Sequence, residues 1–97
     1  MKAVFIPYNQ AYQVRLMEIL DRMNIRGITM WENVQGRGSE KGEPHYGDHA
    51  WPTMNSAILT IIPDEKVSSL LEKIHALDKE TERLGIHAFV WSVDKMV

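Results

Sequence analysis

The sequence predicts an α+β fold in which strands and helices follow the order β-α-β-β-α-β. Two short apolar runs, near residues 2–6 and 56–62, are each followed by a segment with apolar residues at helical spacing. Two further runs, at 28–34 and 86–93, have strand character. The halves have similar lengths, so we expect a ferredoxin-like fold, in which a four-stranded antiparallel sheet carries two helices on one face.

The first half begins with a predicted strand, Lys2–Ile6, that Pro7 stops. Asn9 can then cap a helix over Gln10–Ile25 through its side-chain oxygen. Gly27 is the expected terminator just beyond this helix. The apolar face of the helix consists of Leu16, Met17, Leu20 and Met23.

The second predicted strand, Ile28–Val34, alternates between two faces, as expected of a half-buried strand. One face carries Ile28, Met30 and Val34, and the other carries Thr29, Trp31 and Asn33. Glu32 falls on the face that should be buried. Its charge predicts that this strand lies at a sheet edge or that the strand ends nearby.

The second half begins with a β-branched strand over Ser56–Ile62, after which Pro63 and Asp64 mark a helix start. We expect this helix to continue to Gly85 and the last strand to cover Ile86–Val93. The apolar stripe of the helix consists of Val67, Leu70, Leu71, Ile74, Leu77 and Leu84.

Two helices cover only one face of such a sheet, so the other face meets water or another subunit. Trp31, together with Trp91 or Phe89, should point to this uncovered face. Large aromatic side chains are costly to leave in water, and a sheet-to-sheet oligomer would bury them. The alternative is that these aromatic residues belong to the core beneath the helices.

Length and composition limit the classes of function. The 97 residues and 44% hydrophobic content suit a single domain, 1–97, with one modest core. A net charge of −2 without a long basic run argues against a nucleic-acid partner. The absence of cysteine fits a reducing compartment, and the brief apolar run before Pro7 predicts neither a signal peptide nor membrane insertion. We expect a cytoplasmic protein.

The polar chemistry concentrates between Gly36 and Pro52, a stretch without strand or helix periodicity that predicts a long surface loop. Gly36, Gly38 and Gly42 allow sharp turns and expose N–H groups to an anion, and Lys41 adds a positive charge. Glycine-rich loops that only turn are more common, so both interpretations stay open.

His45, Asp48 and His49 are candidate metal ligands within the same loop. Imidazole and carboxylate ligands suit zinc, copper or nickel, and neighbouring subunits could complete such a site. The alternative is a solvated polar loop. His45 with Asp48 could also serve as a base and its orienting group, but the sequence offers no nucleophile signature and no oxyanion site. We therefore do not expect an enzyme.

Over nearly its whole length the chain resembles the PII nitrogen-regulatory signal proteins. The residues that carry the resemblance are Gly27–Thr29, Val34–Gly42, the Ile61–Asp64 junction and Phe89–Val93. The resemblance implies a homotrimer with nucleotide-binding clefts between subunits and a signalling loop, here 36–52, that docks onto a partner such as a transporter or enzyme. It implies a regulator and assigns the effector site to Gly36, Gly38, Glu40, Lys41, Gly42 and His87.

Several positions depart from the family pattern. Glu40 replaces a glutamine, and His87 and Asn55 replace lysines. Residues Lys79–Gly85 have helical character where the family has a glycine- and lysine-rich loop, and the family's paired arginines are missing before Val97. These losses remove positive charge and argue against ATP, leaving the effector unnamed. We predict a PII-like regulator; the alternative is a metal-binding or divalent-ion tolerance protein that uses the loop histidines.

Overall fold

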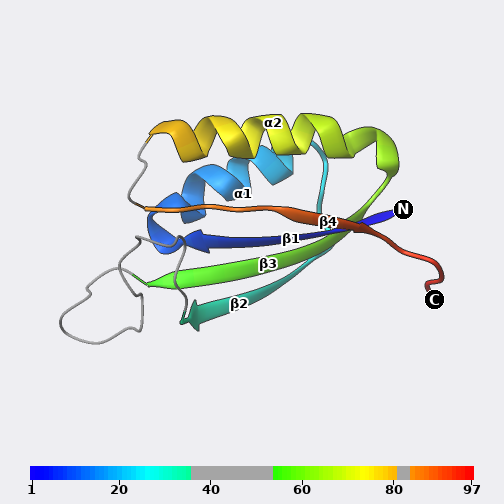
Figure 1. Ribbon diagram of the computed structural model, residues 1–97, viewed down its shortest axis with the longest axis horizontal. Coiled ribbons are helices and arrows are strands. Elements are labelled where there is room, and N and C mark those ends of the chain that lie inside the picture. Colours follow the sequence, from blue (N-terminus) through cyan, green and yellow to red (C-terminus); the bar gives the residue numbers. More distant parts are fainter. Residues whose placement is uncertain (36–53, 81–83) are drawn as a thin grey trace.

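The computed structural model describes residues 1–35, 54–80 and 84–97. Four antiparallel strands form one sheet in the order β2-β3-β1-β4, and both α-helices lie on the same face of it (Figure 1). This arrangement confirms the predicted α+β, ferredoxin-like fold. The elements in chain order are β1 (Lys2–Asn9), a 3₁₀ turn (Gln10–Tyr12), α1 (Gln13–Arg22), β2 (Ile28–Val34), β3 (Asn55–Ile62), α2 (Asp64–Glu80) and β4 (Phe89–Ser92).

The core lies between the sheet and the two helices. Alternate residues of the two central strands point toward the helices, among them Val4, Ile6 and Ile58, which are fully buried. The helices contribute their predicted apolar stripes, and burial of these side chains supplies most of the favourable free energy of folding. The helical members of the core are Leu16 and Leu20 of α1 and Leu70, Ile74 and Leu77 of α2.

The strand β1 continues through Pro7 to Asn9, so the prediction that Pro7 stops it was wrong. Pro7 is opposite Ala57 in β3, and on its other side its carbonyl oxygen accepts a hydrogen bond of 3.0 Å from the His87 N–H. Proline has no N–H, so it cannot return a bond to His87. This explains why β4 begins at Phe89 instead of the predicted Ile86, which is left in an isolated bridge with Tyr8.

The predicted capping role of Asn9 is confirmed for the 3₁₀ turn that leads into α1, whereas the predicted terminator of the helix was wrong. The Asn9 Oδ1 atom accepts a hydrogen bond of 2.9 Å from the Ala11 N–H. The helix ends at Arg22, and the residue that terminates it is Asn24, which has a φ of 57°, and not Gly27. The Asn24 and Ile25 N–H groups donate to the carbonyls of Asp21 and Leu20, which is the Schellman pattern of a helix end.

The second helix begins at Asp64, as predicted, but Leu84 is not part of it. Within the described residues α2 ends at Glu80, and Leu84 already lies in a turn. Gly85 has a φ of 85°, a conformation that glycine adopts without steric cost. Its carbonyl oxygen accepts a hydrogen bond of 3.0 Å from the Asn9 N–H, which ties this turn to the end of β1.

The prediction that Glu32 marks a sheet edge is confirmed, because β2 is an edge strand and Glu32 is exposed. The pairing of β2 with β3 is irregular between Trp31 and Val34. Asn33 has a φ of 57° there, which is consistent with a β-bulge. The irregularity turns the end of β2 just before the chain leaves the sheet.

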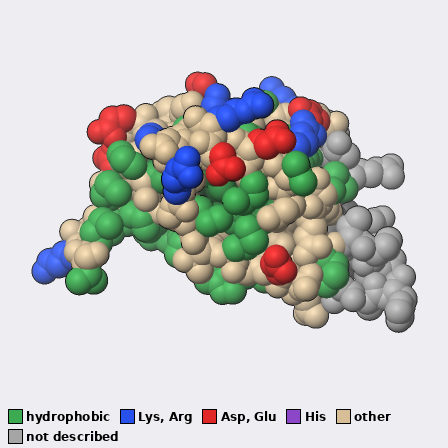
Figure 2. All heavy atoms as spheres, turned by 180° about the vertical axis from the view of Figure 1, so that it is seen from behind, with side chains coloured by type: hydrophobic (Ala, Val, Ile, Leu, Met, Phe, Trp, Pro, Cys, Tyr) green, Lys and Arg blue, Asp and Glu red, His purple; other side chains and the backbone are tan. Residues whose placement is uncertain are grey.

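The face of the sheet opposite the helices is apolar and exposed, as predicted. Trp31 is 44% exposed, Trp91 50% and Phe89 55%. The ring of Phe5, from the central strand, contacts Trp31 edge-on with ring centres 6.4 Å apart. Charged side chains gather over the helical layer in the upper part of Figure 2, whereas the lower part, over the sheet, is mostly apolar or uncharged.

None of the helices in the described ranges is both long and apolar enough to cross a membrane.

Candidate functional site

The ends of three strands meet where residues 36–53 leave and rejoin the sheet. Val34 at the end of β2 pairs with Asn55 at the start of β3, and Asn55 pairs with Asn9 at the end of β1. The turn that follows α2 reaches the same place through the bond between Asn9 and Gly85. The tertiary structure therefore gathers polar groups from four parts of the chain at one end of the sheet.

Gln10 joins the two sides of this junction. Its side-chain Nε2 donates to the Asn33 Oδ1 at 2.7 Å and to the Ser56 Oγ at 3.3 Å. Its backbone N–H donates to the Met54 carbonyl at 2.7 Å. One residue thus contacts described residues that precede and follow the 36–53 segment, and it holds Asn33 close to Met54 and Ser56.

Tyr8 and Gln13 form the buried side of the junction. The Tyr8 hydroxyl donates to the Gln13 Oε1, and the Gln13 Nε2 contacts the Met30 sulfur at 3.7 Å. Burial raises the pKa of the Tyr8 phenol above its ordinary value of 10.0. A hydrogen bond from Ser56 partly opposes this, and the negative charge of Glu32 adds to it. The phenol therefore stays neutral and acts as a donor at physiological pH.

Asn9 is fully buried at the centre of the junction. Its Oδ1 is used in capping, but its Nδ2 has no hydrogen-bond partner among the described residues. A buried donor without a partner costs about 1–3 kcal/mol. A group with a free acceptor oxygen placed beside Asn9 would recover this free energy.

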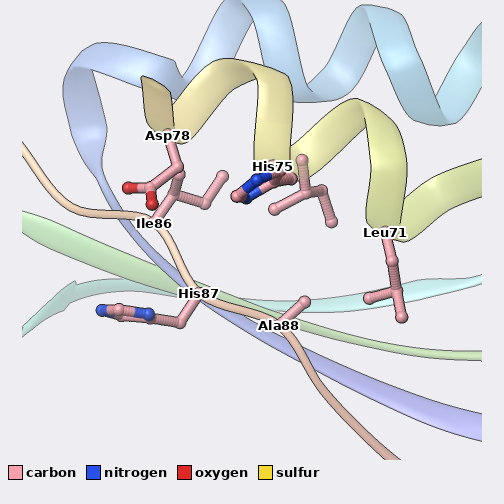
Figure 3. Close-up of a pocket in the computed structure, with 7 residues that line it drawn as sticks. Leu71, His75, Asp78, Ile86, His87 and Ala88 are labelled. Atoms are coloured by element: carbon pink, nitrogen blue, oxygen red, sulfur yellow. The ribbon is translucent and has the colours of Figure 1, made fainter. Parts of the chain in front are cut away.

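His87 is the one predicted site residue that lies within the described residues. Its exposed side chain stacks on Phe89 with ring centres 6.2 Å apart. His87 also lines a pocket of about 200 Å³ between α2 and the chain leading into β4, and His75 and Asp78 extend into this region from α2 (Figure 3). The lining residues are Leu71, Ile74, His75, Asp78, Ile86, His87 and Ala88.

The other predicted site residues lie outside the described residues. These are the effector candidates Gly36, Gly38, Glu40, Lys41 and Gly42, and the metal candidates His45, Asp48 and His49. Within the ranges 1–35, 54–80 and 84–97, no group of three or more histidine and acidic side chains is placed to hold a metal ion.

Sequence reasoning missed the network around Gln10. Its members are amides and hydroxyls, which are common at turns, and their separation along the chain hides their proximity. One local signal was present: Asn9 and Gln10 directly follow an apolar run, and Gln13 lies one helical turn after Gln10. The bond from Gln10 to Ser56, 46 residues away, follows only from the strand register.

The fold is that of known PII-like proteins. A structure of CPII, a nitrogen regulatory PII-like protein from Thiomonas intermedia K12, bound to ADP, AMP and bicarbonate, matches with a TM-score of 0.76 at 24% identity, covering 93% of this chain and 82% of that one. CPII bound to ADP and bicarbonate matches with a TM-score of 0.75 at 26% identity and the same coverage. A putative PII-like signaling protein from Thermus thermophilus matches with a TM-score of 0.64 at 21% identity, covering 93% and 83%.

The sequence itself gives the family. The family described as "Nitrogen regulatory protein P-II" matches residues 1–97. The chain belongs to the P-II family, which confirms the resemblance drawn from its glycine-rich run and strand junctions. No curated protein sequence matches the chain.

Proposed function

We propose that this chain is a PII-like signal-transduction protein that acts as a homotrimer. In this proposal an effector binds at the clefts between subunits, and the 36–52 segment passes the signal to a partner protein such as a transporter or enzyme. We place the protein in the cytoplasm, which fits the absence of cysteine. The observation that carries the proposal is the exposed apolar sheet face, which adjoins the polar junction around Gln10.

The exposed aromatic side chains supply a driving force for self-association. Trp31, Phe89 and Trp91 are each about half exposed, so roughly 100 Å² of each side chain remains to be buried. At about 25 cal/mol per Å², this corresponds to about 2–3 kcal/mol for each residue. His87 stacks on Phe89, so burial of this face in a trimer would place His87 beside the contact between subunits.

The proposed effector site joins the loop residues to the described junction. It consists of Gly36, Gly38, Glu40, Lys41, Gly42 and His87, with Asn9 Nδ2 as an additional donor. The structural neighbours with ADP, AMP and bicarbonate bound support nucleotides with few phosphates and small oxyanions as effectors. The family has lysines where this chain has Asn55 and His87, so less positive charge is available here. A triphosphate should therefore bind less tightly than ADP or AMP.

Calorimetry with ADP, AMP, ATP and bicarbonate tests the effector site. We expect saturable binding of ADP or AMP that is tighter than that of ATP, and a loss of about tenfold or more in a Lys41→Ala/His87→Ala variant. A Lys79→Ala/Lys95→Ala variant, which removes two exposed cations elsewhere, is the matched control. Binding that is unaffected by the first variant would remove these residues from the site.

Hydrogen exchange tests the signalling step. An effector shifts the state of the 36–52 segment only if it binds one state better than the other, and a few kcal/mol of preference is enough. We expect slower exchange in this segment when the effector is bound. Equal exchange with and without every effector that binds would contradict the proposed signalling role.

A further inference from the structure

A groove of about 460 Å³ lies between α1 and α2 on the helical side of the molecule. The ion pair between Arg15 and Glu80 crosses one end of it. Toward the other end, the Lys66 Nζ donates to the Met23 carbonyl at 2.9 Å and bridges the two helices again. The lining residues are Arg15, Glu18, Ile19, Arg22, Met23, Lys73, Ala76, Leu77 and Glu80. The groove is therefore short and bounded at both ends.

The lining of the groove is apolar at its base and charged along its rim. Ile19 and Met23 from α1 are partly buried, and Leu77 from α2 is buried. Arg22 and Lys73 stand on opposite helices, and in the described part of the chain neither has a carboxylate within ion-pair distance. The three basic and two acidic side chains of the lining leave a net charge of +1.

We propose that this groove binds a medium-chain aliphatic monocarboxylate, with its hydrocarbon chain over the apolar base and its carboxylate between Arg22 and Lys73. The volume lies in the range of about 300–1,000 Å³ that is usual for small-ligand pockets. The single net positive charge matches a monoanion. Because both ends are bridged, the groove suits a short ligand better than a continuous partner helix.

The groove is independent of the proposed trimer and effector site. Both helices lie on one face of the sheet (Figure 1). The exposed aromatic residues lie on the other face, as their exposure and strand register show. Packing of the open sheet faces would leave the groove accessible. Failure of the effector test would therefore not affect this proposal, and failure of the groove test would not affect the effector site.

Octanoate is the probe, with octylammonium and octanol as ligands of equal chain length but different charge. We expect saturable binding of octanoate to one site per chain, with amide chemical-shift changes concentrated in residues 15–23 and 73–80. Octylammonium and octanol should bind at least about tenfold more weakly, because neither carries a carboxylate to accept charge-assisted hydrogen bonds from Arg22 and Lys73.

Two variants separate the roles of the head and the chain of the ligand. Arg22→Gln/Lys73→Gln should weaken octanoate binding about tenfold without changing octanol binding. Ala76→Phe, at an exposed position of the groove lining, should block all three ligands while circular dichroism shows an intact fold. Lys79→Gln/Lys95→Gln, outside the groove, should change nothing.

Four outcomes would overturn the proposal, three of them in the binding measurements. The first is octylammonium binding as tightly as octanoate, and the second is a loss of octanoate affinity in Lys79→Gln/Lys95→Gln equal to that in Arg22→Gln/Lys73→Gln. The third is no saturable binding of octanoate up to about 10 mM, a concentration that corresponds to a binding free energy of only about 3 kcal/mol. Chemical-shift changes that map away from both helices would have the same consequence.

Discussion

At the scale of single residues, the polar junction depends on side chains that each make more than one contact. Gln10 holds Asn33 and Ser56 together, and its own backbone N–H is bonded to Met54. Removing such a side chain leaves several polar groups without partners at once. The junction is therefore sensitive to substitutions that would be neutral on an ordinary polar surface.

We predict that Gln10→Ala lowers the free energy of unfolding by about 1–2 kcal/mol, because the Asn33 and Ser56 side chains lose their shared donor. Urea denaturation gives this value. Lys79→Ala is the matched control, since Lys79 is exposed on α2, and it should change the free energy by less than about 0.5 kcal/mol. A Gln10→Ala protein as stable as the control would show that the network contributes little.

Tyr8 should make the stability of the protein fall at alkaline pH. Its folded-state pKa is raised above 10.0 by burial, so both states keep the proton below about pH 10. Above that pH the unfolded state releases its proton first, and the free energy of unfolding falls until the pH passes the folded-state pKa. Urea denaturation at pH 8–11.5, with phenolate absorbance recorded in parallel, measures this loss.

The comparison with Tyr8→Phe isolates the contribution of the phenol. At neutral pH this variant should be less stable by about 1 kcal/mol, because Gln13 loses its donor. The difference from the unsubstituted protein should narrow above pH 10, since phenylalanine cannot ionise. A difference that stays constant up to pH 11.5 would rule out a raised pKa for Tyr8.

At the scale of elements, backbone conformation sets the ends of helices and strands. The α1 helix ends where Asn24 adopts a left-handed conformation, and Ile25 then packs into the core as Leu20 does. Asparagine tolerates this conformation better than most residues, whereas a β-branched side chain does not. The position of Asn24, rather than that of Gly27, therefore fixes the length of the helix.

We predict that Asn24→Gly keeps or raises the free energy of unfolding by up to about 1 kcal/mol, and that Asn24→Val lowers it by about 1–2 kcal/mol. Thermal and urea denaturation of the pair measure the difference. A valine substitution at Gly27, where φ is not positive, serves as the control and should be tolerated. Equal stability of the two Asn24 variants would contradict the Schellman assignment.

Pro7 explains the late start of β4. A Pro7→Ala variant supplies the missing N–H opposite His87, so the ladder between β1 and β4 can extend toward the bridge at Ile86. We predict that the new amide of residue 7, which would donate to the His87 carbonyl, exchanges more slowly than exposed amides do. Rapid exchange of the new amide would show that another feature stops the strand.

At the scale of the whole molecule, the sheet has one side covered by helices and one side open. The open side carries Trp31, Phe89 and Trp91, and the polar junction lies at one end of the same sheet. Self-association through this face would bury the aromatic side chains.

We predict that Trp31→Glu/Trp91→Glu converts the protein from a trimer to a monomer at micromolar concentration, because charges would be buried between the sheets. Light scattering coupled to gel filtration gives the mass. Val14→Glu is the control, since Val14 is 68% exposed on α1 and should leave the trimer intact. A monomeric unsubstituted protein would contradict the proposed trimer and, with it, clefts between subunits.

The sequence alone determined the order of elements and the apolar faces of the helices. It also indicated that Trp31, with Trp91 or Phe89, faces outward, whereas a core position for these residues stayed open until the structure showed all three exposed. These predictions follow from local periodicity, which the chain carries within windows of a few residues. The capping role of Asn9 and the edge position of Glu32 were likewise predicted from the residue type and its neighbours in the sequence. The P-II family was also recognisable from short runs of residues.

Only the tertiary structure decided how the elements end and which polar groups meet. Strand β1 runs through Pro7 and meets His87, a pairing that depends on register between the two ends of the chain. Gln10 donates to Ser56 only because the assembled sheet brings these two distant residues together. The groove between α1 and α2 likewise forms only when the two helices pack on the sheet. Local patterns do not encode such pairings, because strand register and helix packing are set by the core as a whole.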